Sequence, residues 1–233
     1  MKSSEWQRGR EKGASLTEFI IVGPIAILLT FVLLQAGLLY MAKLTLNNAV
    51  FMAARHGAVN YAQAGSIKDS LAKGLIPFYQ NAFEGSDTAR LATAYAKAKV
   101  AVTTGLNVKL DILSPSEEAF RLYGIARDGV TSIPNDNLEF RTATPIRGGN
   151  ISLRDANILK LKVTYAYELK VPLMQAIFKR IMCPLGEDSV VRGWERPSML
   201  PMGDISDCLY YMQGRVPIVS YATVQMQTPA RKG

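Results

Sequence analysis

The chain has 233 residues, of which 48% are hydrophobic, and it carries a formal net charge of +8. This length allows one domain, or one small domain with a membrane anchor. The lysines and arginines are scattered along the chain, with no run of five or six. The pattern argues against a nucleic-acid footprint and favours a solvated basic surface, so we expect no nucleic-acid partner.

The first predicted element is a membrane-spanning helix. From Phe19 to Ala42 the sequence contains no charged residue. A helix over this run is about 36 Å long, which is enough to cross a bilayer core of about 30 Å. The run is too long for the apolar region of a cleaved secretory signal, so we expect the span to stay in the protein.

Basic residues before the span predict its orientation. These residues are Lys2, Arg8, Arg10 and Lys12, against only Glu5 and Glu11. An excess of lysine and arginine beside a span stays on the cytoplasmic side. We therefore expect a single pass with a cytoplasmic N-terminus, and the chain after Lys43 on the other side of the membrane.

An acid and a glycine stand at the start of the span. Glu18 directly precedes the apolar run, and Gly13 lies five residues before it. By position alone, Glu18 fits either a functional acid of the membrane segment or an interfacial acid that favours the positive end of the helix. The pattern Gly13…Glu18-Phe19 resembles the prepilin leader of TadE-like pilus assembly proteins, the minor pilins of tight-adherence systems. The resemblance is strong over residues 8–62 and only architectural after them.

The resemblance implies how the N-terminus is processed and used. A prepilin peptidase would cut after Gly13 and leave Ala14 as the first mature residue. Glu18 would then pair with the amine of Ala14, by preference that of a neighbouring subunit. Many type IV pilins have phenylalanine at the first mature position, so Ala14 leaves methylation of that amine open.

The resemblance also implies an architecture and a role. The expected fold is a pilin-like α+β fold, in which the long N-terminal transmembrane helix continues into a domain with an antiparallel β-sheet. Residues 1–13 would be the leader, 14–62 the helix with a span at about 19–42, and 63–233 a periplasmic α+β domain. The protein would be a minor pilin, or pseudopilin, of the bacterial inner membrane. Its partners would be membrane lipid, other pilin subunits and the pilus assembly machinery, and the chain would stay in the membrane or enter the pilus.

Hydrophobic periodicity predicts three helices and a strand in the first half of the chain. The first helix should run from about residue 15 to 62, with Leu46, Val50, Ala53, Gly57 and Tyr61 on one face. Helices follow at 66–81, with Ser66 as its cap, and at 88–102, with Leu91, Tyr95 and Ala98 in phase. Residues 106–112 alternate as a half-buried strand does.

The second half of the chain is less regular. Residues 114–156 are expected to form a mobile loop, with a helix start at 114–118 and a short strand at 138–141. Residues 159–171 alternate as a strand buried on one face. A helix at 172–182 is expected to face the core, with an interfacial helix on lipid or on a partner as the alternative. A last strand is expected at 218–227 and a frayed tail at 229–233.

The two cysteines are candidates for a disulfide. Cys183 and Cys208 both follow the span, and in an oxidising compartment a bond between them would contribute about 3–4 kcal/mol. Two free thiols are the alternative. A metal site needs more ligands than these, and His56 is the chain's one histidine, so we expect no metal.

Motifs for catalysis are missing from the sequence. It contains no G-x-S-x-G, G-x-G-x-x-G or P-loop pattern, and a single histidine makes a catalytic triad improbable. Glu117 and Glu118 are adjacent, so on a helix they diverge and cannot flank a substrate. We expect neither an enzyme nor a cofactor. The competing hypothesis is a permanently anchored periplasmic enzyme or binding domain whose leader only resembles the prepilin motif.

Overall fold

The computed structural model describes residues 11–81, 85–127, 129–146, 148–182 and 205–232, and the side chains of 11–17 and 205–208 lie outside this description. The chain divides into two compact units. One unit, here the span unit, contains Met1–Tyr40 and Glu168–Arg215. The other, here the sheet unit, contains Met41–Tyr167 and Val216–Gly233. The predicted combination of a long apolar helix with an α+β domain that holds an antiparallel sheet is confirmed.

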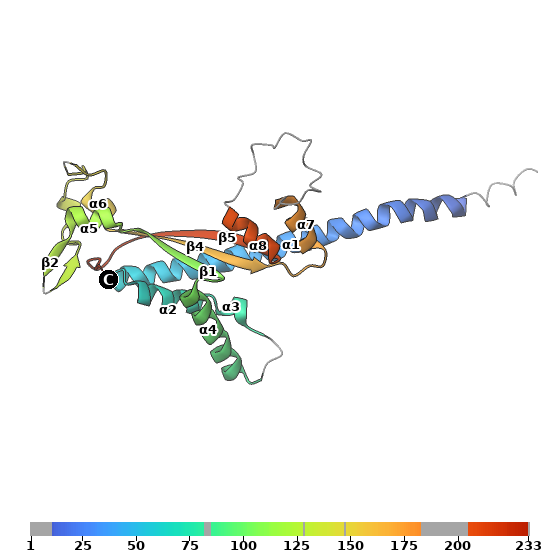
Figure 1. Ribbon diagram of the computed structural model, residues 1–233, viewed down its shortest axis with the longest axis horizontal. Coiled ribbons are helices and arrows are strands. Elements are labelled where there is room, and N and C mark those ends of the chain that lie inside the picture. The colour runs from blue at the N-terminus through green and yellow to red at the C-terminus, as the bar shows by residue number, and fades with distance from the viewer. Residues whose placement is uncertain (1–10, 82–84, 128, 147, 183–204, 233) are drawn as a thin grey trace, which may run out of the picture. The chain divides into compact units, whose positions relative to one another are not determined.

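The longest element is helix α1, Glu11–Val59, which contributes to both units (Figure 1). Its second half carries the predicted apolar face, because Leu46, Val50 and Ala53 are fully buried. The helix ends three residues before the predicted boundary. Tyr61 and Ala62 adopt left-handed backbone conformations, with φ of 57° and 56°, which an α-helix does not accept.

Three helices follow in the sheet unit: α2 Ala64–Gly74, α3 Ile76–Tyr79 and α4 Asp87–Thr104. The single helix predicted at 66–81 is divided at Leu75, and Pro77, which has no backbone N–H, lies in the first turn of α3. Ser66 is not the cap of α2, since the N-cap is Gln63. The buried face of α4 contains Ala94, Ala98, Ala101 and Val102, so the predicted stripe is right only at Ala98.

The main sheet has three strands in the order β1–β4–β5, with β1 Val108–Ser114, β4 Ile158–Glu168 and β5 Arg215–Gln225. Strand β1 is antiparallel to β4, and Val108 lies opposite Tyr165. The alternation predicted for 159–171 is confirmed, because every odd-numbered residue in that range is buried. Ala166 is buried as well, and its N–H donates to the carbonyl oxygen of Asn107, next to β1.

Within the sheet unit, the second half of α1 is tied to β5 and the residues after it. The side chain of Lys43 donates to the carbonyl oxygen of Val219, and the hydroxyl of Ser220 donates to Asn47 Oδ1 at 2.8 Å. The N–H of Gln227 donates to the carbonyl oxygen of Ala58 at 3.0 Å. These bonds hold β5 and the residues after it against the helix along several turns.

The predicted loop at 114–156 contains regular structure, so that prediction is wrong in its main point. Helix α5, Glu117–Tyr123, begins where a helix start was predicted, with Ser116 Oγ accepting from the N–H of Ala119. Strands β2 Ile125–Arg127 and β3 Val130–Ser132 form an antiparallel hairpin. Leu138–Phe140 is a 3-10 helix (η1) and not the predicted strand, and α6 Leu153–Ala156 follows a capping box of Ser152 and Asp155.

The C-terminal tail is folded onto the sheet unit, so the predicted fraying is wrong. Ala230 is fully buried, and its carbonyl oxygen accepts from the N–H of Ile133 at 2.9 Å. The N–H of Arg231 donates to the carbonyl oxygen of Tyr61. The guanidinium of Arg231 lies 3.7 Å from the centre of the aromatic ring of Tyr61. Backbone bonds that the isolated tail could not form therefore order it up to Lys232.

The span unit contains two further helices, α7 Met174–Met182 and α8 Ile205–Met212. The side-chain amide of Gln175 donates to the carbonyl oxygen of Leu169 at 3.0 Å. The N–H of Leu169 donates to the carbonyl oxygen of Gly214 at 3.2 Å. Helix α7 was predicted, whereas α8 was not. The prediction that α7 faces the core is wrong, because Met174 is the one residue of this helix that is buried.

Candidate membrane-anchoring segment

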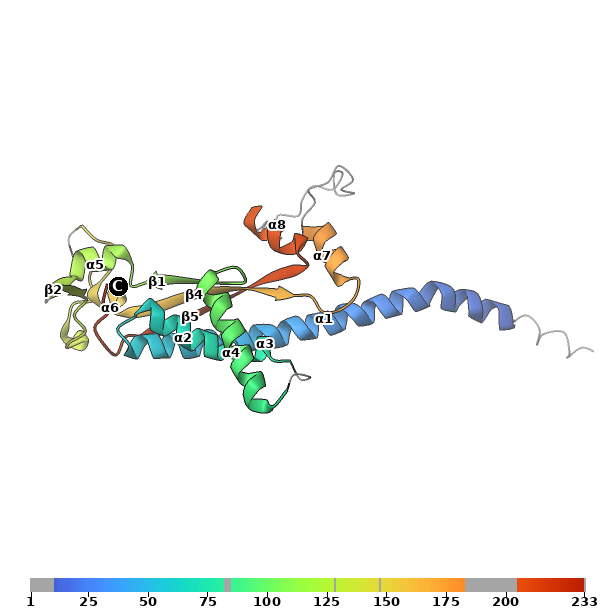
Figure 2. The same cartoon turned by 60° about the horizontal axis from the view of Figure 1, so that its bottom comes forward.

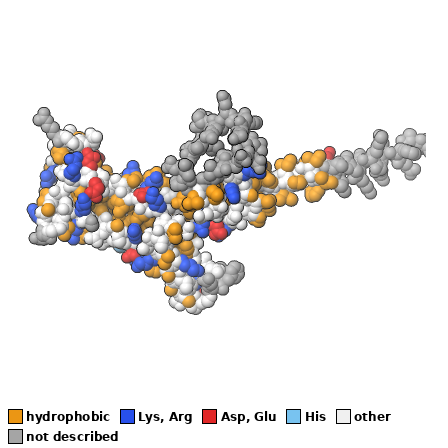
Figure 3. All heavy atoms as spheres, viewed as in Figure 1, with side chains coloured by type: hydrophobic (Ala, Val, Ile, Leu, Met, Phe, Trp, Pro, Cys, Tyr) orange, Lys and Arg blue, Asp and Glu red, His pale blue; other side chains and the backbone are white. Residues whose placement is uncertain are grey.

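The first half of α1 exposes apolar side chains along its length. Large hydrophobic residues from Phe19 to Tyr40 are mostly 40–75% exposed, and Figure 3 shows hydrophobic side chains covering this part of the helix. Among the described residues, one helix, Glu18–Val59, is long and apolar enough to cross a membrane. Leaving this surface in water would be costly, because hydrophobic burial stabilises by about 25 cal/mol per Å². The helix therefore indicates single-pass anchoring in a membrane.

Glu18 stands at the head of this surface. Its side chain is exposed, and it lies one helical turn after Ala14, a spacing that brings two side chains to the same face. The backbone of Gly13 and Ala14 lies in the first turn described for α1, but the side chains there are outside the description.

Two polar side chains inside the apolar run are held differently. The hydroxyl of Thr30 donates to the carbonyl oxygen of Ala26 at 2.8 Å, so the helix itself satisfies it. Gln35 is 1% exposed, and its Oε1 accepts from the N–H of Val171 at 3.0 Å. The Nε2 atom of Gln35 is buried without a hydrogen-bond partner among the described residues. No role was predicted for Gln35, although a lone amide in a long apolar run is a signal of a specific polar contact.

The remaining sequence-predicted site residues are not brought together by the described structure. Cys183 lies outside the described residues, and Cys208 belongs to α8 without a described side chain, so the disulfide stays a prediction. His56 Nδ1 lies 3.0 Å from Ser66 Oγ. In the described ranges, no group of three or more histidine, cysteine or acidic side chains is placed to hold a metal ion.

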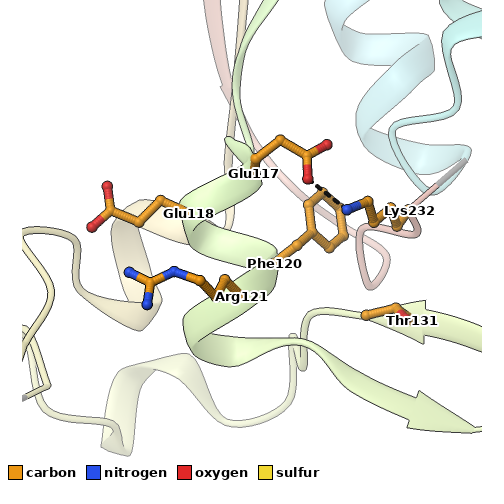
Figure 4. Close-up of a pocket in the computed structure, with 6 residues that line it drawn as sticks. All are labelled: Glu117, Glu118, Phe120, Arg121, Thr131 and Lys232. Atoms are coloured by element: carbon orange, nitrogen blue, oxygen red, sulfur yellow. Dashed lines mark hydrogen bonds and ion pairs between the residues drawn. The ribbon is translucent and has the colours of Figure 1, made fainter.

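A shallow hollow of about 600 Å³ lies beside α5 in the sheet unit (Figure 4). Glu117 Oε2 and Lys232 Nζ form an ion pair across it at 2.5 Å, above the ring of Phe120. Glu118 and Arg121 point away from this pair, so the two adjacent glutamates diverge as predicted. Glu117 is 81% exposed, and exposed ion pairs contribute less than about 1 kcal/mol. The pair joins the C-terminal tail to α5.

Comparison with known proteins identifies the N-terminal segment. The family model of the TadE-like protein matches residues 13–55, which include Gly13, Glu18, the whole apolar run and most of the buried half of α1. The predicted resemblance to TadE-like pilus assembly proteins is thereby confirmed over this segment. The match indicates a protein associated with a tight-adherence pilus. No curated protein and no solved structure matches the chain.

Proposed function

We propose that this protein is a minor pilin, or pseudopilin, that helps to initiate or assemble a tight-adherence pilus after a prepilin peptidase cuts between Gly13 and Ala14. The proposal includes a cytoplasmic N-terminus in the bacterial inner membrane and a periplasmic domain at residues 63–233. Its role is structural: it places a helix among the packed helices of a fibre or of the complex that starts one.

One observation supports this role above the others. Glu18 stands exposed at the head of an apolar helix surface that has few protein neighbours, within the segment that matches the TadE-like family. A soluble domain would cover such a surface, and a simple anchor needs no acid at its end. A subunit that packs through its span uses both features, since lipid and neighbouring helices cover the surface and the acid sets their register.

The chemistry proposed for Glu18 is charge pairing in an apolar surrounding. Cleavage after Gly13 would create a cationic amine on Ala14, one turn from the carboxylate of Glu18. A lone charge costs about 2.5–3.5 kcal/mol at the centre of a span and less near its edge. Pairing with the amine of a neighbouring subunit offsets that cost only when the two helices have the correct axial stagger.

Processing and pairing are tested by separate variants. Mass spectrometry of the mature chain should find Ala14 as its first residue, and Gly13→Leu should leave the full-length chain in the membrane. Glu18→Gln keeps the size of the side chain and removes its charge. We expect this variant to be inserted and cut like the parent. It should then either be depleted about tenfold or more from sheared pilus fractions or fail to initiate fibres.

A matched control and two opposing outcomes keep the test sharp. Glu139→Gln makes the same chemical change at an exposed acid of the sheet unit and should assemble normally. An intact Met1 on the mature chain, recovered with a periplasmic substrate or partner, would support a permanent anchor instead. Assembly of Glu18→Gln at the parental level would leave Glu18 as an interfacial acid. The Cys183–Cys208 bond is tested by alkylation, which should fail until a reductant is added.

A further inference from the structure

Helix α7 and the residue before it expose apolar side chains. Leu173, directly before the helix, is 63% exposed, and Ile181 and Met182 at its end are 60% and 40% exposed. Met174 is the buried residue of the helix. In α8, Leu209 and Met212 are also more than half exposed. Amphipathic helices with this much uncovered apolar surface are typical of interfaces with lipid or with another protein.

The contacts within the span unit place α7 at one end of the membrane span. Val171, three residues before α7, donates its N–H to Gln35, and Gln35 is buried there. Both ribbon views show α7 beside α8 (Figures 1 and 2). Gln35 lies about 26 Å along the helix axis from Glu18, near the far edge of a bilayer core of about 30 Å. Tyr40, exposed at about 33 Å, suits the aromatic belt of the membrane interface.

The charges of this segment fit an anionic membrane surface. From Lys170 to Met182 the sequence has three basic residues, Lys170, Lys179 and Arg180, and no acidic one. The nearest acid, Glu168, is engaged by Lys170 at 2.8 Å. Lys179 and Arg180 are exposed, in the last turn of the helix that exposes Ile181 and Met182. Neighbouring apolar and basic side chains on one short helix are the combination that binds an anionic lipid interface.

We propose that α7 is an interfacial helix that lies on the anionic lipid surface at the outer end of the span, with Leu173, Ile181 and Met182 in the acyl boundary and Lys179 and Arg180 at lipid phosphates. The hydrogen bond between Gln35 and Val171 fixes the depth of this helix relative to the span. The inference rests on single-pass anchoring and not on the role in pilus assembly, so either can fail alone.

Fluorescence quenching in a bilayer tests the depth of α7. The full chain, with Trp6→Phe and Trp194→Phe, is reconstituted in nanodiscs that contain phosphatidylglycerol and lipids brominated near the top of the acyl chains. One tryptophan is introduced by Ile181→Trp. It should lose about half of its emission, because interfacial helices bury their apolar face about 5–10 Å into the headgroup boundary.

Two controls flank this variant. Val100→Trp changes a helical β-branched residue of equal exposure, 60%, in α4 of the sheet unit and should not be quenched. Leu29→Trp lies within the span and should be quenched; if it is not, the anchoring and the proposal fall together. Adding Lys179→Gln and Arg180→Gln to Ile181→Trp should reduce its quenching in anionic discs to the level in zwitterionic ones. Circular dichroism checks that each variant folds.

Two outcomes would overturn the proposal. One is emission from the Ile181→Trp variant that brominated lipid quenches no more than that of Val100→Trp. The other is emission from the Ile181→Trp variant that brominated lipid does not quench but that shifts to the blue in discs holding two copies of the chain. A second copy of the chain, and not lipid, would then cover α7. Quenching of Ile181→Trp at one copy per disc supports the lipid surface.

Discussion

The two halves of α1 share one continuous helix and differ in what surrounds it. From Phe19 to Tyr40 the helix exposes large apolar side chains, with Gln35 as a local exception. From Met41 to Val59 its buried face combines Leu46 and Val50 with alanines at positions 42, 49, 53, 54 and 58. Small side chains let α2 approach the second half closely, whereas the large exposed apolar side chains of the first half suit lipid. Hydrophobicity alone therefore does not say whether a helix surface is covered by protein.

Removing a large side chain from each half should give the largest contrast. Leu46 is 0% exposed and Leu33 is 63% exposed. Leu46→Ala should lower the free energy of unfolding of the sheet unit by about 2–5 kcal/mol, because it leaves a cavity in the core. Leu33→Ala should change it by less than about 0.5 kcal/mol. Pulse proteolysis of the full chain in detergent and urea measures both, and equal losses would contradict the assignment of the two surroundings.

The close approach of α2 to the second half of α1 predicts a smaller effect of one added methyl group. A Cβ on Gly74 would lie 2.7 Å from Ala49 Cβ and 2.8 Å from its Cα, so the two helices must separate. Gly74→Ala should cost about 1–3 kcal/mol, even though alanine favours helix formation by about 1 kcal/mol. Gly65 in the same helix has no atom within 4 Å of an added Cβ, and Gly65→Ala should be neutral or stabilising. The same proteolysis assay decides, and a Gly74→Ala variant as stable as Gly65→Ala would show that the helices are not in close contact.

The smallest effect concerns the charge pair beside α7. A hydrogen bond from Lys170, together with its charge, lowers the pKa of the Glu168 carboxyl, and partial burial acts in the opposite direction. A lowered folded-state pKa adds stability above the unfolded value of about 4.3, and this stability is lost as the pH falls through the folded value. Both side chains are more than half exposed, so less than about 1 kcal/mol is involved. The stability difference between the parent and Lys170→Met should be present at about pH 7 and absent at about pH 3. A difference that does not change with pH would assign the effect to packing of the lysine stem.

Patterns with a strong local cause were predictable from the sequence. The charge-free run made the span evident, and Gly13, Glu18 and Phe19 carried the resemblance that the family match confirms. The alternation from Leu159 to Val171 gave both the strand and its buried face. In each case the side chains of one element contain the information, because a strand with period two or a helix with an apolar stripe has one way to bury that face.

Features that depend on distant residues could be decided only by the tertiary structure. The tail from Ala230 to Lys232 is ordered because Tyr61, Thr131 and Ile133 offer backbone partners far away in the sequence. The contact of Gln35 was evident only from the fold, which brings the N–H of Val171 to its side chain. Helix α7 does not face the core, because the fold buries only one of its residues, Met174. A single amide, a short tail and an amphipathic helix are compatible with several surroundings, and long-range contacts select among them.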